Sequence, residues 1–294
     1  MEKRAYFRAP LLPWLLLAPQ LVIISVFFFW PAAQAVVQSL QMQDSFGLST
    51  QWVGLDNFRQ LLGDPAYLES FKTTAIFSVL VAVVGIALAL MLAVFADRIV
   101  RGALAYRTLL IVPYAVAPAV AGVLWLFMFS PDIGVVSWTL AHAFGFNWNH
   151  LLNSGHAMGL IVAAAVWKQI SYNFLFFVAG LQSVPHSLIE AAAIDGARPW
   201  RRFWDIQLPM LSPTTFFLLV INVVYAFFDT FAIIDATTQG GPGRDTAILV
   251  FKVYHDGVKG GDLGGSAAQS VILMFVVIAL TVVQFRYVER KVNY

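Results

Sequence analysis

Long apolar stretches separated by short polar segments dominate this chain. A helix that crosses roughly 30 Å of hydrocarbon needs about 20 mostly apolar residues, and the sequence contains six such stretches. They cover residues 11–37, 73–96, 108–129, 157–181, 211–234 and 267–285. Apolar residues run continuously through each one, without the alternation that a barrel strand requires. The pattern predicts an all-α membrane protein with six transmembrane helices in a single domain, residues 1–294.

The first stretch shares some features with a secretory signal peptide. Basic residues precede it, and Ala33-Gln34-Ala35 resembles a signal-peptidase site. However, its apolar run from residue 11 to residue 30 is longer than the 7–15 residues typical of a signal-peptide core. We therefore expect this stretch to be retained as a span.

The lysines and arginines are distributed unevenly among the polar segments, and such residues accumulate on the cytoplasmic side of membrane proteins. Of the 18, twelve fall in the two terminal segments and in the second and fourth loops: Lys3, Arg4, Arg8, Arg98, Arg101, Arg107, Arg198, Arg201, Arg202, Arg286, Arg290 and Lys291. The other loops are longer but hold only Arg59, Lys72, Arg244, Lys252 and Lys259. The distribution predicts that both termini are cytoplasmic.

Composition narrows the function classes. Hydrophobic residues make up 60% and charged residues 12% of the chain, which argues against a soluble, disordered or nucleic-acid-binding protein. The chain has no cysteine and only five scattered histidines, so we expect no metal site. It also lacks the G-x-x-x-x-G-K-[ST] phosphate loop. We therefore expect neither ATP hydrolysis nor another enzymatic activity from this chain.

The fourth loop, residues 185–209, has the local chemistry of two short helices. Ser187 and Glu190 fit a capping box that would start the first helix, and Gly196 suits the left-handed residue that ends it. Pro199 fits the first position of the second helix, and Pro209 is expected to help stop it.

The second helix of this loop is amphipathic. Its large side chains fall at helical spacing on one face: Trp200, Phe203, Trp204 and Gln207. One interpretation is a hairpin that rests on lipid headgroups. The other is an ordered knob that docks onto a soluble partner and transmits its motion.

The same loop carries a recognisable motif. Glu190-Ala191-Ala192, followed by Gly196, Ile206 and Leu208-Pro209, resembles the E-A-A…G…I-x-L-P loop of permease subunits of binding-protein-dependent ABC importers. In that family the loop docks into the ATP-hydrolysing subunit. The resemblance implies a coupling role for Glu190, Ala191, Ala192, Asp195, Gly196, Arg201, Ile206, Leu208 and Pro209.

Further segments resemble one branch of that family. Residues 54–58 and 238–242 are similar to segments of the carbohydrate-type permeases, whereas residues 109–120, 167–177 and 225–231 resemble permeases of glycerol-3-phosphate importers. The resemblance implies the type I ABC importer permease fold and half of a pathway for sn-glycerol 3-phosphate, with glycerophosphodiesters as further candidates. A neutral sugar or oligosaccharide is the alternative solute.

The resemblance also implies an assembly in the bacterial inner membrane. Its other members would be a second homologous permease, two copies of an ATPase that bind ATP and magnesium, and a periplasmic solute-binding protein, whereas this chain would hold no cofactor. The rival from another class is an ion-coupled secondary transporter or channel, which would work as a lone chain.

Lys168 lies near the middle of the fourth span, where facing lipid would cost about 3 kcal/mol or more. Polar residues form one stripe around it and a second on the fifth span: Lys168, Gln169, Tyr172 and Asn173, and Asn222, Tyr225 and Asp229. Our hypothesis is that these stripes line the translocation route. An ion pair between Lys168 and Asp229 that holds the two spans together is the alternative. In the third span, Pro113 and Pro118 permit kinks that suit either a gating helix or stable packing.

Overall fold

The computed structural model describes residues 11–43, 49–98 and 102–288. The chain divides into two compact units, Met1–Gly63 with Val253–Ile272 and Asp64–Lys252 with Leu273–Tyr294. The predicted cytoplasmic location of both termini involves residues 1–10 and 289–294, which lie outside the described residues. That location and the single domain predicted over the chain stay predictions.

The first unit begins with one long apolar helix that matches the first predicted span. It runs from Leu12 to Gln38 and consists of α1 (Leu12–Ile24), the π-helical segment η1 (Ser25–Phe29) and α2 (Trp30–Gln38). None of its residues is buried within the chain, as expected of a helix whose surroundings are supplied by lipid or by another subunit.

A small turn-rich region follows this helix. Strand β1 (Gln41–Gln43) pairs antiparallel with β2 (Thr50–Trp52), and the short helix α3 (Asp56–Gly63) follows. The Asn57 side-chain amide donates to the carbonyls of Ser39 at 2.9 Å and Gln41 at 3.0 Å. This buried amide therefore fixes α3 against the strand.

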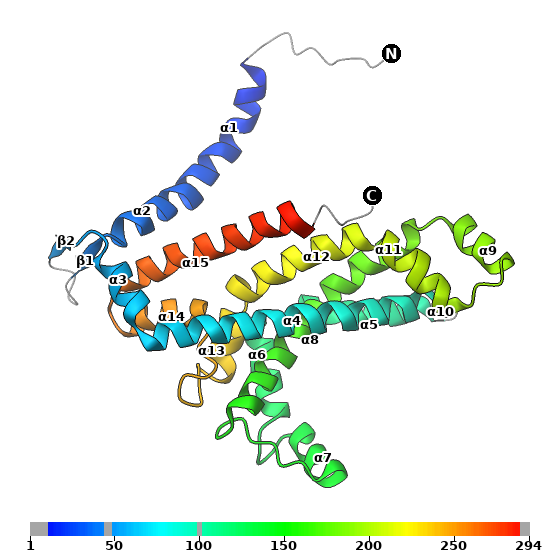
Figure 1. Cartoon of the computed structure of the whole chain (residues 1–294). Coiled ribbons are helices and arrows are strands. Elements are labelled where there is room, and N and C mark those ends of the chain that lie inside the picture. Colours follow the sequence, from blue (N-terminus) through cyan, green and yellow to red (C-terminus); the bar gives the residue numbers. More distant parts are fainter. Residues whose placement is uncertain (1–10, 44–48, 99–101, 289–294) are drawn as a thin grey trace. The chain divides into compact units, whose positions relative to one another are not determined.

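Helix α8 (Ser154–Ser183) is the centre of the second unit. It packs most extensively against α4 (Pro65–Arg98), and Figure 1 shows these two long helices side by side. The remaining elements that begin in this unit are α5 (Ala103–Ala115), α6 (Pro118–Met128), α7 (Val135–Phe144), α9 (His186–Ile194), α10 (Pro199–Arg202), η2 (Phe203–Gln207), α11 (Leu208–Met210), α12 (Ser212–Val224), η3 (Tyr225–Asp229), α13 (Phe231–Thr237), α14 (Leu249–Tyr254) and η5 (Gln284–Val288). Two more elements begin in the first unit, η4 (His255–Lys259) and α15 (Leu263–Val283).

Small residues allow α4 and α8 to approach closely. Buried alanines occur on both helices, among them Ala89 and Ala93 on α4 and Ala164 and Ala165 on α8. Membrane helices have no hydrophobic force between them comparable to that in water, so close van der Waals contact must hold them together. Larger buried aromatic and aliphatic side chains complete two apolar clusters along the pair.

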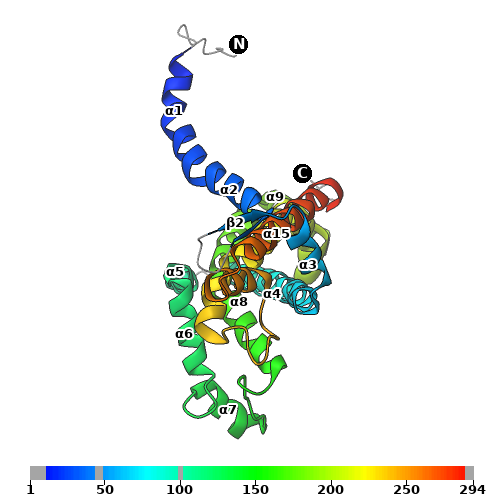
Figure 2. The ribbon, with the colours of Figure 1, turned by 90° about the vertical axis from the view of Figure 1, so that its left-hand side faces the viewer.

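The third predicted span, residues 108–129, is wrong as a single helix. Helices α5 and α6 are bent relative to each other by 103° at the break between them, and Figures 1 and 2 show α6 leaving the direction of α5. Val116 and Ala117 are both extended, with ψ angles of 133° and 141°. Because Pro118 has no N–H and restricts the residue before it, the helix cannot continue through this point.

The other predicted spans are present as helices. Besides the first, they correspond to Pro65–Asp97, Ser154–Ser183, Ser212–Asp229 and Leu263–Arg286. The described residues thus contain five helices long and apolar enough to span a membrane, or six if the bent pair counts as one span. The predicted all-α fold is confirmed, although several helix ends differ from the predicted boundaries by many residues.

Candidate functional site

The loop between α8 and α12 consists of two short helical segments. The first is α9, and the second runs from α10 through η2 into α11. Gly196 lies between them with a φ of +80°. The Ala197 N–H donates to the Ala192 carbonyl at 2.9 Å, and the Gly196 N–H donates to the Ala193 carbonyl at 3.1 Å. These bonds form a Schellman motif, which confirms the predicted helix end at Gly196.

Two local predictions for this loop are wrong. The capping box is absent, because α9 begins at His186 directly after the extended residue Pro185 and its cap makes no side-chain hydrogen bond. Ser187 consequently lies inside the first turn. Pro209 does not stop the second helix but lies within α11. The π-helical segment η2 directly precedes α11, and such local widening accommodates a missing backbone N–H.

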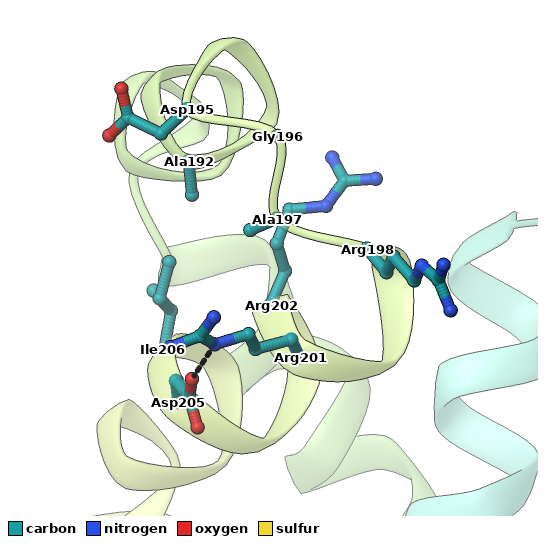
Figure 3. Close-up of a pocket in the computed structure, with 9 residues that line it drawn as sticks. All are labelled: Ala192, Asp195, Gly196, Ala197, Arg198, Arg201, Arg202, Asp205 and Ile206. Carbon is teal, nitrogen blue, oxygen red and sulfur yellow. Dashed lines mark hydrogen bonds and ion pairs between the residues drawn. The ribbon is translucent and has the colours of Figure 1, made fainter.

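One side of the loop is polar. Helix α9 and the second segment enclose a cavity of about 490 Å³, which Figure 3 shows with its lining residues: Ala192, Asp195, Gly196, Ala197, Arg198, Arg201, Arg202, Asp205 and Ile206. The Arg201 Nε donates to Asp205 Oδ2 at 3.1 Å. Arg201 therefore forms its ion pair with Asp205 on its own helical segment, and this exposed pair does not include Asp195.

The opposite side of the second segment is apolar and faces the C-terminal half of α4. A pocket of about 340 Å³ is lined by Trp200, Phe203 and Trp204 together with residues of α4 between Ala87 and Phe95. The predicted amphipathic arrangement is therefore present. Helix α9 differs, because none of its residues is buried and Ile194 is 87% exposed. Exposed apolar side chains that lie together are typical of a surface that binds lipid or another protein.

A second cavity, of about 410 Å³, lies within the helical bundle. Five of the predicted pathway residues line it: Lys168, Gln169, Tyr172, Tyr225 and Asp229. The other lining residues are Tyr114, Pro118, Ile221 and Val224. Tyr114 and Pro118 were not predicted as pathway residues, although the proline in an apolar stretch marked this position as irregular.

Lys168 is the cation of this cavity. Its Nζ donates to the backbone carbonyl of Tyr114 at 2.7 Å and lies 5.0 Å from the centroid of the Tyr114 ring. The Tyr114 ring in turn stacks on that of Tyr172, with centroids 6.3 Å apart. Among the described residues, no ion pair joins Lys168 to Asp229, so the ammonium is held by a neutral carbonyl.

The two predicted pathway asparagines lie elsewhere. Asn173 and Asn222 are fully buried and do not line the cavity. Their side chains exchange two hydrogen bonds, with N–O distances of 3.1 Å and 2.8 Å, and Asn222 also donates to the Leu218 carbonyl at 2.7 Å. Gly85 of α4 faces this pair, and a Cβ there would lie 3.5 Å from Asn173 Nδ2. Three helices therefore meet at the asparagines.

A family of transport proteins matches the part of the chain that holds the loop and the cavity. Residues 83–294 match the family described as the binding-protein-dependent transport system inner membrane component, and this range contains both the loop of residues 185–209 and the cavity around Lys168. The chain belongs to this family. It is thus a membrane permease, a transport component rather than an enzyme, and the resemblance found in its sequence is confirmed.

The permease also has similar relatives over essentially its whole length. It is 62% identical over 288 residues to the sn-glycerol-3-phosphate transport system permease protein UgpA of Agrobacterium fabrum (strain C58), covering 98% of each chain. The identity to the protein of the same name from Rhizobium meliloti (strain 1021) is 62% over 292 residues, with 99% of each chain covered. For the Escherichia coli (strain UTI89) protein it is 60% over 293 residues, with 100% and 99% covered.

Solved structures show that the permease has an ABC importer fold. A bacterial ABC transporter involved in the import of the acidic polysaccharide alginate matches with a TM-score of 0.78 at 22% identity, covering 94% of this chain and 96% of that chain. The alginate transporter in complex with an alginate pentasaccharide-bound periplasmic protein matches with a TM-score of 0.83 at 20% identity, covering 96% and 95%. At these identities the likeness concerns the fold alone.

Proposed function

We propose that this permease forms half of the translocation pathway of an ATP-driven importer of sn-glycerol 3-phosphate in the bacterial inner membrane. The relatives named for that solute are 59–62% identical to it. The structural observation that carries the proposal is the position of Lys168, which places a positive charge in a cavity within the membrane bundle. Glycerophosphodiesters are further candidate solutes.

The chemistry of the cavity suits a phosphate ester with hydroxyl groups. A phosphate monoester carries nearly two negative charges at pH 7 and three strong acceptor oxygens. The Lys168 ammonium has three donors, of which the Tyr114 carbonyl accepts one. Tyr172, Gln169 and Asp229 line the same cavity and offer neutral donors and an acceptor for glycerol hydroxyls. A single ammonium favours transient binding, as transport requires.

We assign the coupling role to the loop from α9 to α11. In the proposed assembly a second homologous permease completes the pathway, two copies of an ATPase bind ATP and magnesium, and a periplasmic binding protein delivers the solute. Closure of the ATPase pair would move the exposed helix α9 and, through the loop, the bundle. This permease would itself hold no cofactor, and both termini would be cytoplasmic.

Uptake by the reconstituted complex tests this proposal. Proteoliposomes containing both permeases and the ATPases, supplied with binding protein, should accumulate radiolabelled sn-glycerol 3-phosphate only when ATP is present inside. Lys168→Met should lower the uptake rate at least tenfold, because a hydrogen bond to a charged group contributes about 1.5–3 kcal/mol and each 1.4 kcal/mol is a factor of about ten. Unlabelled maltose should not compete.

A matched control removes a cation elsewhere. Lys72 is an exposed residue of α4, so Lys72→Met should leave uptake unchanged, and both variants should assemble as judged by size-exclusion chromatography. Competition by a neutral sugar would favour the alternative solute. Uptake by this permease alone, without ATPase, would reject the importer in favour of a secondary transporter or channel.

A further inference from the structure

The carbonyl that Lys168 contacts is one that the helix itself cannot satisfy. In an uninterrupted α-helix, the Tyr114 carbonyl would accept the N–H of the residue four positions later. That residue is Pro118, which has no N–H. The Lys168 ammonium, from the separate helix α8, donates to this same carbonyl at 2.7 Å.

The contact lies directly at the break between α5 and α6. Tyr114 is the last residue but one of α5, and the 103° bend follows within the next few residues. The carbonyl end of a helix carries a partial negative charge, which a cation stabilises. The Tyr114 ring, 5.0 Å from Lys168 Nζ, adds a cation–π contact. Both contacts connect the end of α5 to α8.

We propose that Lys168 is a solute-sensitive latch on the α5–α6 break. This proposal rests on the proposed function, because it requires an anionic solute in the cavity that Lys168 lines. The solute phosphate first accepts from the donors that the Tyr114 carbonyl leaves available, and it then draws the ammonium away from that carbonyl, because an anionic oxygen is the stronger acceptor. When the phosphate binds the ammonium, the carbonyl loses its charged partner. Helices α5 and α6 are then free to straighten, so that the bend between them becomes smaller than 103°.

The latch gives solute a way to bias the conformation of the permease. A ligand shifts a conformational equilibrium only by binding the two states differently. Here the difference is the Lys168–Tyr114 bond, which is present in one state and exchanged for phosphate in the other. By linkage, releasing the break must favour phosphate binding to the same extent.

The angle at the break can be followed with two spin labels. The chain has no cysteine, so Leu104→Cys on α5 and Phe127→Cys on α6 provide unique sites in this subunit, once cysteines in the other subunits are replaced. Leu104 is 82% and Phe127 58% exposed. Pulsed electron–electron double resonance on the complex in nanodiscs then reports the separation of the two labels, measured with and without sn-glycerol 3-phosphate and its binding protein. A smaller bend should lengthen it by about 5 Å or more, given a rise of 1.5 Å per residue.

Three variants give definite expectations. In the otherwise wild-type complex, solute should lengthen the separation. In Lys168→Met, the separation without solute should already equal the solute-bound value. In Pro118→Ala, the restored N–H can satisfy the Tyr114 carbonyl within the helix, so the separation should be long with and without solute although Lys168 is retained. Lys72→Met should behave as wild type.

Two outcomes would overturn the latch. One is a wild-type separation that solute does not change, and the other is a Lys168→Met separation without solute equal to that of wild type. The second outcome combined with lost uptake would leave the proposed function intact, because Lys168 would then bind solute without holding the break. Normal uptake by Lys168→Met would instead contradict the role of Lys168 in the proposed function itself.

Discussion

Asn173 and Lys168 lie on the same helix, α8, yet their polar groups are in opposite situations. Asn173 is fully buried and exchanges two hydrogen bonds with Asn222. Lys168 is half-buried and donates one bond to a carbonyl at the wall of a cavity. The asparagine amides are satisfied within the chain, whereas the ammonium keeps donors for another molecule.

The difference separates a structural polar group from one available to a ligand. Buried amides inside a membrane must be paired, and a reciprocal pair between two helices fixes their register. A cation at the edge of a cavity needs an anion or a dipole but not a particular one, so its partner can be exchanged. Substitution of the first kind should change assembly, and substitution of the second kind should change transport.

The largest expected effect on stability is at the asparagine pair. Asn173→Leu leaves the Asn222 side-chain oxygen without its partner, and the complex should lose about 1–2 kcal/mol of stability. Thermal unfolding of the purified complex in detergent measures this loss. Uptake per assembled complex should remain near the wild-type rate. Full stability with lost uptake, the result expected for a Lys168 variant, would place Asn173 on the translocation route. It would contradict the distinction between the structural asparagine and the solute-binding lysine.

The double variant sharpens the same comparison. Asn173→Leu with Asn222→Leu removes both amides, so neither is left unpaired, and the loss should be smaller than the sum of the single losses by about 1 kcal/mol. Strictly additive losses in a thermal-unfolding cycle would mean that the two amides do not stabilise each other. The bond from Asn222 to Leu218 cannot be tested in the same way, because Leu218 takes part only through its backbone carbonyl.

Two tyrosines of the cavity repeat the contrast at a smaller scale. The Tyr225 hydroxyl is buried and donates to the Ala165 carbonyl at 3.2 Å, whereas the Tyr172 side chain is half-buried beside Tyr114 and Lys168. Tyr225→Phe should lower stability by about 1 kcal/mol and leave uptake per complex unchanged. Tyr172→Phe should leave the melting temperature unchanged and raise the KM for sn-glycerol 3-phosphate severalfold. The reverse pattern would contradict the assignment of both hydroxyls.

The sequence predicted the spans because the bilayer imposes a length on every apolar helix. It predicted the position of an irregularity at Pro118 for a similar local reason, the missing N–H. It did not predict a bend of 103°, since the angle depends on how α6 packs against α13 and α8. Such packing joins residues far apart in the chain and leaves no local pattern.

The candidate site was predictable only in part for a related reason. Helical spacing placed Asn173 on one stripe with Lys168, and Asn222 on another with Asp229. A stripe that faces a cavity and a stripe that faces a neighbouring helix have the same spacing, so the asparagine pair could not be recognised. In the coupling loop, the spacing of a capping box is likewise present, but α9 begins two residues too early for Ser187 to cap it.

The smallest expected effect on stability is in the coupling loop. Arg201 and Asp205 form an ion pair whose side chains are 77% and 59% exposed, and exposed pairs contribute at most about 1 kcal/mol. Arg201→Ala should therefore shift the melting temperature of this permease hardly at all. If the loop docks onto the ATPase, the same variant should still lower solute-stimulated ATP hydrolysis by the complex, because the lost charge faces the partner. Arg59→Ala is the control, because Arg59 forms a similarly exposed ion pair with Asp56 on α3. Equal hydrolysis by both variants and wild type would mean that the polar side of the loop does not contribute to coupling, and would leave the exposed face of α9 as the docking surface.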